Sequence, residues 1–329
     1  MPNKPPIAPV RWTPPPVDAL PEFGPAELTI VPMPGDAPED VVVDTDGQLW
    51  TGLADGRIVR VTADGTTKVV ADTGGRPLGL HVAGDGRLLI CDSHRGLLAM
   101  DRDTGVLETL VTHAAGHPLK FCSNVTETSD GTIYFTESTS RFHYEHFEAA
   151  ILEARGTGGL YKLTPDGSVS TIADGLYFAN GVTVTADATA LVFAETQARR
   201  LSRFELTGPQ QGTVRPLAVN LAGMPDNIST GSDGRIWVAM VTPIVQAAEW
   251  LAPRAPMLRQ LVWRLPHALQ PKPIDEVWAA AFDPGSGAAV AGLRLKHPDF
   301  GQVTGLVEHD GRLWMSSIGH PALAHCALP

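Results

Sequence analysis

The chain has 329 residues, and 43% of them are hydrophobic, so it can bury a large core and is not expected to be disordered. Its formal net charge of −11, with no visible basic stripe, argues against binding to nucleic acid. No apolar run approaches the roughly 18 residues of a membrane-spanning helix, so no integral membrane segment is expected. The three cysteines lack metal-type spacing, which argues against a disulfide framework and a structural zinc site.

The first predicted unit is a proline-rich N-terminal arm, residues 1–25. Its composition fits a polyproline-like segment on the surface, and it fits a solvated tail equally well. The arm lacks the apolar stretch of a secretory signal peptide, so the sequence predicts a cytoplasmic protein.

An Asp-Gly turn, followed by one residue and an aliphatic or aromatic pair, recurs along the rest of the chain. The turns begin at Asp46, Asp85, Asp130, Asp187, Asp233 and Asp310, and the fourth is degenerate because Ala188 replaces the glycine. The shortest spacing, from Asp46 to Asp85, matches one four-stranded propeller blade. The longer spacings indicate insertions within blades.

The first repeat can be assigned strand by strand. Residues 39–44, 48–52, 57–62 and 66–71 have strand character and are joined by tight turns, which predicts an antiparallel meander. Six such units predict an all-β six-bladed β-propeller, a single domain spanning residues 26–329. The sixth repeat is too short for a fourth strand, so we expect the strand at 26–33 to complete it and close the ring.

Two insertions interrupt the repeats, at residues 139–158 and 242–260. The second insertion leads into a segment in which Leu258, Leu261, Val262 and Leu265 follow the i, i+3, i+4, i+7 pattern of an amphipathic helix. Both insertions join the second and third strands of their blades. We therefore expect helical segments that form an apolar roof over the face where the first strands begin.

Oxygen-bearing side chains recur where the first strand of each repeat begins. Glu39, Asn180 and Asp226 lie seven residues before their turns, and Asn124 lies six before. Since the innermost strands of a propeller line its central channel, these four should converge on the axis. Carboxylate and amide oxygens suit a hard cation, which predicts a site for calcium or a similar divalent cation. A single such residue would more commonly be a turn or cap residue.

Other side chains are predicted near this site. Leu78 and Thr304 occupy the same region in the second and sixth repeats, and flanking loops bring Phe121, Phe178, Glu137 and His320 toward the substrate pocket. Asp226 is the first candidate for activating water, with Glu39 assisting and His94 as a weaker candidate base.

Several of these motifs resemble one superfamily of calcium-dependent six-bladed propellers. Pro38-Glu39-Asp40, Ser123-Asn124, Phe178-Ala179-Asn180-Gly181 and Met224-Pro225-Asp226-Asn227 resemble the calcium-binding strand starts of gluconolactonase/regucalcin-like proteins, paraoxonases and strictosidine-synthase-like proteins. Gly156 to Leu160 and Glu308 to Gly311 most resemble the strictosidine-synthase-like branch. The resemblance implies that Glu39, Asn124, Asn180 and Asp226 are calcium ligands, with Asn227 as a fifth.

The sequence also departs from these relatives. Thr304 stands where plant strictosidine synthases have a catalytic glutamate, which argues against a Pictet–Spengler condensation. Paraoxonases use a histidine in the second blade near Leu78, and this chain has none at that position. Phe121-Cys122-Ser123 replaces the arginine of regucalcin-like enzymes, so the expected substrate is less polar than a sugar lactone.

Three functions remain open at this point. The first is a calcium-dependent hydrolase that acts on lactones or esters of a fairly apolar small molecule. The second is a non-hydrolytic enzyme on the same fold, such as a condensing enzyme, isomerase or lyase. The third is a binding propeller with structural calcium. The sequence leaves the oligomeric state open.

Overall fold

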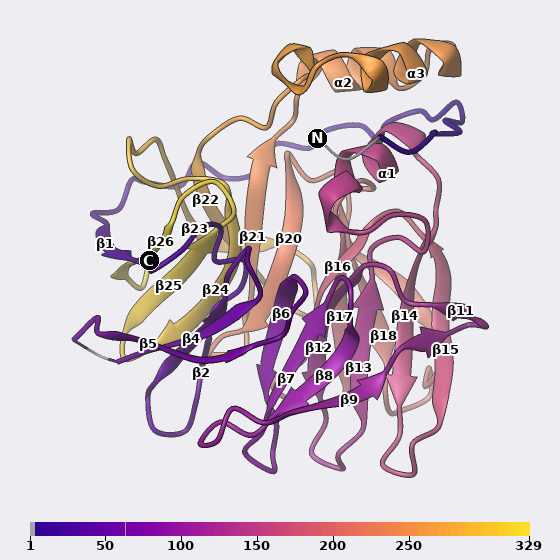
Figure 1. The fold of residues 1–329 in the computed structure, drawn as a ribbon. Coiled ribbons are helices and arrows are strands. Elements are labelled where there is room, and N and C mark those ends of the chain that lie inside the picture. Colours follow the sequence, from indigo (N-terminus) through magenta and orange to yellow (C-terminus); the bar gives the residue numbers. More distant parts are fainter. Residues whose placement is uncertain (1–3, 63) are drawn as a thin grey trace.

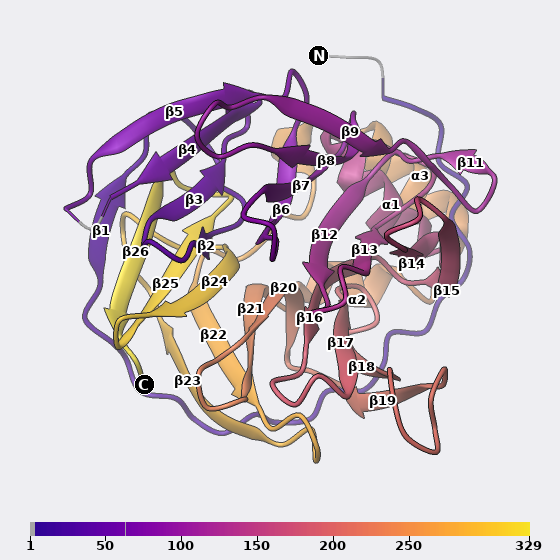
Figure 2. The ribbon, with the colours of Figure 1, turned by 90° about the horizontal axis from the view of Figure 1, so that it is seen from below.

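The computed structural model describes residues 4–62 and 64–329 and shows six four-stranded antiparallel sheets arranged around a central axis (Figures 1 and 2). The expected six-bladed propeller is therefore confirmed. Blade 1 contains β2 (Val42–Val43), β3 (Leu49–Gly52), β4 (Arg57–Val61) and β5 (Thr67–Asp72). Blade 2 contains β6 (Pro77–Val82), β7 (Leu88–Asp92), β8 (Gly96–Met100) and β9 (Leu107–Val111).

The next two blades follow the same plan. Blade 3 contains β12 (Cys122–Glu127), β13 (Ile133–Glu137), β14 (Gly158–Leu163) and β15 (Val169–Leu176). Blade 4 contains β16 (Ala179–Val184), β17 (Ala190–Glu195), β18 (Arg200–Glu205) and β19 (Val214–Ala218). A small hairpin of β10 (His113–Ala114) and β11 (His117–Pro118) precedes blade 3.

The last two blades close the ring. Blade 5 contains β20 (Gly223–Thr230), β21 (Ile236–Pro243), β22 (Val277–Phe282) and β23 (Ala289–Leu295). Blade 6 combines β24 (Val303–His309), β25 (Arg312–Ser317) and β26 (Ala322–Ala327) with β1 (Thr29–Pro32). Thr29 pairs with His325 and Pro32 with Ala322, so the N-terminal strand closes the ring as the sequence predicted.

The turns between the first and second strands show why Asp-Gly recurs. Gly47, Gly86, Gly131 and Gly234 all have positive φ, between 75° and 89°, which glycine adopts without steric cost. In the degenerate fourth turn Ala188 itself takes φ 54°. The turn geometry is thus retained even where the glycine is absent.

The hydrophobic core is divided among the interfaces between blades. Six apolar clusters each join two neighbouring blades, and a seventh lies under the helices. Trp50, Trp237 and Trp314 lie in three of the interblade clusters and are almost fully buried. Burial between blades, rather than within one sheet, therefore holds the ring together.

Both insertions form helices over one end of the propeller. The first contains η1 (Tyr144–His146) and α1 (Phe147–Glu153), and the second contains α2 (Gln246–Leu251), α3 (Pro256–Arg264) and η2 (His267–Leu269). Figure 1 shows α1 lying directly over the sheets, with α2 and α3 above it. We call residues 139–158 and 242–274 the roof.

The orientation of α3 differs from the expectation of an apolar roof. The helix buries Arg259 and Trp263, while Leu258, Leu261 and Leu265 of the predicted apolar stripe are exposed. The arm explains this, since its backbone fills the inner side of the helix and supplies carbonyl groups to Arg259 and Trp263. Amphipathicity predicted the helix correctly, but the face it buries is the other one.

The N-terminal arm is bound to the roof and is not a solvated tail. The backbone N–H of Val10 donates to the carbonyl of Glu153 at 2.9 Å, and that of Trp12 donates to the carbonyl of Ala252 at 3.3 Å. Buried Arg259 donates to the carbonyls of both Val10 and Leu152. The arm therefore ties the two insertions to each other before it passes around the outside of the ring to β1 (Figure 2).

Candidate functional site

A β-bulge occurs at the same place in five of the first strands. In blades 2 to 6 the register with the second strand shifts between Pro77 and Leu80 and at the four equivalent places. Each bulge sets two residues of the first strand against one on the partner strand. Bulges of this kind re-aim side chains and are frequent next to functional sites.

The bulges define two rings of equivalent positions around the axis. The upper one, here called the cavity ring, contains Glu39, Leu78, Ser123, Asn180, Asp226 and Thr304. The residue after each of these forms a second ring, here called the glycine ring, which contains Asp40, Gly79, Asn124, Gly181, Asn227 and Gly305. Asn124 therefore does not share a ring with Glu39, Asn180 and Asp226, and Ser123 takes that place.

The glycine ring alternates polar side chains with glycines for a steric reason. A Cβ at Gly79 would lie 2.5 Å from Cα and Nδ2 of Asn124. A Cβ at Gly181 would meet the backbone of Asn227, and one at Gly305 would meet Asp40, both closer than 3.0 Å. Each glycine thus leaves the space into which the neighbouring blade places its polar residue.

Asn124 is held in this ring by hydrogen bonds at both ends of its amide. Its Nδ2 donates to Oδ1 of Asn227 at 3.0 Å and, more weakly, to Oδ2 of Asp40 at 3.4 Å. Its Oδ1 accepts the backbone N–H of Val182 at 3.0 Å. Asn124 could coordinate a cation only by giving up one of these bonds.

The cavity ring contains acceptor atoms that the protein does not satisfy. Oε2 of Glu39, Oδ1 of Asp226 and Oγ1 of Thr304 are buried without a hydrogen-bond partner. Asn180 is partly engaged, since it accepts from Ser123 at 3.1 Å and donates to Thr196 at 3.2 Å. Buried polar atoms without partners are costly and uncommon, so their convergence indicates a place for a bound group.

The raised pKa values of three carboxyl groups in the two rings also indicate a place for a bound group. Burial raises the pKa of Glu39 to about 7, although the charge of Arg76 and the amide of Asn227 oppose this rise. Burial, and then the nearby charge of Glu39, raise the pKa values of Asp40 and Asp226 well above their usual range. Three buried carboxyl groups therefore lie near one another, and Arg76 is the cation that acts on Glu39.

Arg76 is a buried arginine that the sequence patterns did not single out. Its Nη1 donates to the carbonyl of Ala37 at 3.0 Å, and its guanidinium lies 4.5 Å from the ring centre of Tyr144 in the roof. Its Nε and Nη2 are buried without partners. Arg76 thus adds one positive charge beside Glu39, which leaves the carboxyl cluster with excess negative charge.

The donor set fits a hard cation better than a transition metal. Within residues 4–62 and 64–329, no group of three or more His, Cys, Asp and Glu side chains lies in an arrangement suited to metal binding. A cation here would have to use amide and hydroxyl oxygens beside the carboxylates of Glu39 and Asp226. Calcium accepts such mixed oxygen ligands, whereas zinc prefers nitrogen and sulfur.

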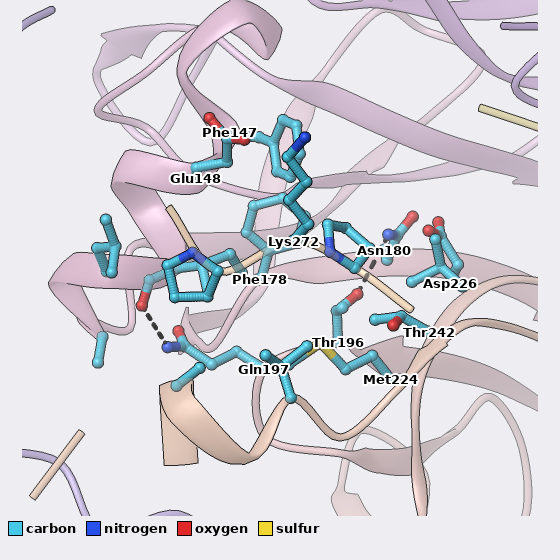
Figure 3. A pocket seen from close by; sticks show the side chains of 18 of the residues that line it. Phe147, Glu148, Phe178, Asn180, Thr196, Gln197, Met224, Asp226, Thr242 and Lys272 are labelled. Atoms are coloured by element: carbon cyan, nitrogen blue, oxygen red, sulfur yellow. Dashed lines mark hydrogen bonds between the residues drawn. The ribbon is translucent and has the colours of Figure 1, made fainter. Parts of the chain in front are cut away.

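A cavity of about 190 Å³ lies between the cavity ring and the roof. Its walls are mainly apolar, and Phe147, Ile151 and Leu251 come from the roof while Trp12 comes from the arm. Figure 3 shows Asn180 and Asp226 at one end of the cavity and Phe147, Phe178 and Lys272 farther along it. The oxygens of the cavity ring thus lie on the propeller side, while Glu148, Glu249 and Lys272 add charged groups to the mainly apolar roof side.

The other predicted pocket residues divide into two groups. Phe121, Phe178 and Thr304 line the cavity, and Leu78 packs with both phenylalanines in the cluster under the roof. Glu137, His320 and His94 do not line it.

These three side chains have other partners. Glu137 is buried and pairs with His117 at 2.8 Å, and His320 pairs with Asp275 at 3.1 Å. His94 lies 3.3 Å from Glu145 at the surface and stacks on His143. The structure therefore does not bring His94, proposed as a weaker candidate base, to the cavity.

Sequence reasoning missed four residues of this region. Ser123 lies seven residues before Asp130, so the spacing that identified Glu39 and Asp226 would have identified it as well. Asp40 lies six residues before Asp46, the same offset as Asn124 before Asp130, so the repeat could have identified it too. Arg76 had no repeat signal, and Trp12 could be placed only once the path of the arm was known.

The class of protein follows from the fold and this axial site, and comparison with known proteins agrees. Residues 38–248 match the family described as SMP-30/gluconolactonase/LRE-like region, and the chain belongs to that family. A gluconolactonase structure from Xanthomonas campestris covers 93% of this chain and 91% of its own with a TM-score of 0.67, at 20% identity. A regucalcin structure from Agrobacterium tumefaciens has a TM-score of 0.64 at 17% identity and covers 93% and 95%. These two likenesses concern the fold alone.

Proteins whose sequences are more similar to this chain than those of the two structures have other names. Strictosidine Synthase-Like 6 of Arabidopsis thaliana is 34% identical over 68% of this chain, and the chain spans 62% of that protein's length. The adipocyte plasma membrane-associated protein of Salmo salar is 30% identical over 84% of this chain and 72% of its own. The resemblance to the strictosidine-synthase-like branch is thus confirmed. Among the described residues, no helix has the length and hydrophobicity that a membrane span requires.

Proposed function

We propose that the protein is a calcium-dependent hydrolase that acts on lactones or esters of fairly apolar small molecules. The observation that carries this proposal is the set of unpartnered buried oxygens of Glu39, Asp226 and Thr304 at the propeller side of an apolar cavity. A divalent cation would satisfy the carboxylate oxygens of Glu39 and Asp226, and the cavity would hold an apolar acyl or ring group. Membership of a family whose description includes gluconolactonase supports this reaction class.

The proposed ligands are Glu39, Asn180, Asp226 and Asn227, with Asn124 joining only if its amide rearranges. Calcium, or another divalent cation, would supply Lewis-acid polarisation of a carbonyl group and a positive charge for the developing oxyanion. Ser123 holds the oxygen of Asn180, and Thr196 holds its nitrogen, so this amide is oriented before anything binds.

The protein's own groups would perform the remaining tasks. Asp226, through its unpartnered Oδ1, would orient the attacking water and accept its proton, with Glu39 as the second carboxylate of the site. The roof would exclude bulk water from the cavity, and Phe121, Phe178 and Trp12 would contact the apolar part of the substrate.

The experiment combines a metal-binding measurement with a substrate panel. Asp226→Asn should weaken calcium binding in titration calorimetry and lower kcat/KM on lactones and aryl esters by about a hundredfold or more. Asp233→Asn is the matched control, because Asp233 is exposed, lies in an Asp-Gly turn and pairs with Arg235. Full lactonase activity in Asp226→Asn would contradict the proposal.

Two further results would favour one of the two alternative functions over hydrolysis. Products that incorporate no oxygen from labelled water would indicate the non-hydrolytic chemistry that the strictosidine-synthase-like relatives' names suggest. Calcium binding without turnover of any substrate in the panel would indicate a binding propeller. The cytoplasmic location stays a prediction, to be tested by cell fractionation.

A further inference from the structure

Half of the exposed large hydrophobic side chains of the described chain lie in one short segment. There are 14 such side chains, and seven of them fall within residues 250–274. These are Trp250, Met257, Leu258, Leu261, Leu265, Leu269 and Ile274. Scattered exposed apolar residues are ordinary in soluble proteins, but a concentrated set marks an interaction surface. We call these seven residues the roof patch.

Geometry places the roof patch on the outer side of the molecule. On α3 the side chains of Met257, Leu261 and Leu265 follow one another along one face, opposite to buried Arg259 and Trp263. The arm already occupies the inner face through Arg259 and Trp263. No described segment covers the outer face, and Figure 1 shows α2 and α3 at the extremity of the molecule.

The charge around the patch is opposite to that of the whole molecule. Residues 244–274 contain one acidic residue, Glu249, and four basic residues, of which Arg259 is buried on the inner face, in a chain whose net charge is −11. The two acidic residues that follow, Asp275 and Glu276, pair with His320 and Arg294. Glu249 is neutralised by Arg199 at 2.6 Å. Arg264 and Lys272 are exposed and form no ion pair within the described residues, and Arg254 lies over the ring of Trp250 at 3.5 Å.

We propose that the roof patch docks peripherally on a lipid surface that carries anionic head groups. Exposed leucines with a tryptophan, flanked by unpaired basic groups, are the pattern by which helices lie in a bilayer interface. The basic residues would contact the head groups while the apolar side chains enter the acyl boundary. Docking would use helices whose inner side chains, Leu251 and Val262, line the cavity.

A second copy of this chain fits the patch less well. A twofold interface over the patch would gather the positive charges of Arg254, Arg264 and Lys272 from both copies into one contact, and the one acidic residue of the segment, Glu249, is already paired with Arg199, so repulsion between like charges would oppose association. Lipid head groups of negative charge have no such conflict. This docking does not depend on the proposed hydrolase activity, and its test does not measure activity.

Flotation with vesicles tests the proposal on the full chain. The protein should float with vesicles of phosphatidylcholine containing about a third phosphatidylglycerol, and less with pure phosphatidylcholine vesicles. The variant Met257→Ser, Leu261→Ser, Leu269→Ser should bind the anionic vesicles at least about tenfold more weakly. The matched control Val106→Ser, Val214→Ser, Val290→Ser removes apolar side chains that are equally exposed but lie outside the roof, and should bind like the wild type.

A charge variant separates the basic contribution from the apolar one. Arg264→Gln should weaken binding to the anionic vesicles by about fivefold, while exposed Arg312→Gln should leave it unchanged. Absence of flotation with anionic vesicles would overturn the proposal. So would a roof-patch variant that binds like the wild type, or a concentration-dependent dimer in sedimentation that the roof-patch variant abolishes, since the partner would then be a second copy.

Discussion

Three carboxylic acids at the axis are buried, and burial disfavours the ionised form that they usually have. Glu39, Asp40 and Asp226 are acids whose pKa values are raised by burial, and each would normally be solvated or paired. Oε2 of Glu39 and Oδ1 of Asp226 have no hydrogen-bond partner, and leaving such acceptors unsatisfied costs about 1–3 kcal/mol for each group. The proposed cation would recover this cost on binding.

His81 in β6 gives a prediction about pH that is independent of this site. Burial lowers its pKa from 6.5 to about 4, so the folded protein keeps it neutral while the unfolded chain binds a proton below pH 6.5. Stability should therefore fall as the pH drops from about 6.5 to about 4, by a contribution on the order of 2 kcal/mol. Urea unfolding of wild type and His81→Gln across this range measures it. The two proteins should lose stability with different slopes, and parallel slopes would contradict the prediction.

At the scale of elements, the repeated β-bulge determines which residues reach the axis. In a regular strand, Asp226 and Asn227 would point to opposite faces. The bulge at Asp226 and Asn227 allows both side chains to reach the axis. Gly181 on the neighbouring blade leaves room for Asn227. Asn124, six residues before its turn, was grouped with three residues that lie seven before theirs, and the bulge shows that this difference of one position separates two rings.

The glycine ring predicts a substitution that damages the site without changing any ligand. In Gly181→Ala the new Cβ would meet the backbone of Asn227 closer than 3.0 Å and displace it. We expect calcium affinity to fall by at least about tenfold, with a loss of about 1–3 kcal/mol in stability. Calorimetry with calcium measures the first effect. Gly24→Ala, at a position without positive φ where a Cβ meets nothing within 4 Å, is the control for the cost of replacing a glycine.

The arm is an element whose role the sequence left open between a surface segment and a tail. Arg259, buried within α3, donates to carbonyls of the arm and of α1. In Arg259→Met these carbonyls lose a charged donor, so we expect about 2–3 kcal/mol of destabilisation and faster proteolysis within residues 5–18. Arg264→Met, on the exposed side of the same helix, should change neither. Equal protease resistance in both variants would show that the arm is held by other contacts.

At the scale of the whole molecule, the ring is closed by a strand from the far end of the sequence. β1 pairs with β26 through Thr29 to Pro32, and without it β26 would present an unpaired edge. A chain beginning at residue 26 should therefore stay soluble and monomeric or of defined size. A chain beginning at residue 34 should aggregate, and size-exclusion chromatography of both distinguishes these outcomes. If the shorter chain eluted like the longer one, closure by β1 would not be needed for solubility.

Several features of this protein were determined by local sequence alone. Asp-Gly turns at blade spacing, with short apolar runs between them, predicted six antiparallel blades and the closing strand, because glycine at positive φ and period-two burial act over a few residues. The oxygen-bearing residues at the strand starts were recognisable from the repeat, because equivalent positions of successive blades lie around one axis.

Other features depended on contacts between segments far apart in the chain. The bulge register separated Asn124 from the cavity ring, and the packing of loops took His94, Glu137 and His320 out of the cavity. The arm covered the inner face of α3 and turned the predicted apolar stripe outward. Periodicity reports that a helix has two different faces, but the choice of the buried face depends on what packs against it, and here that partner is a segment nearly 250 residues away.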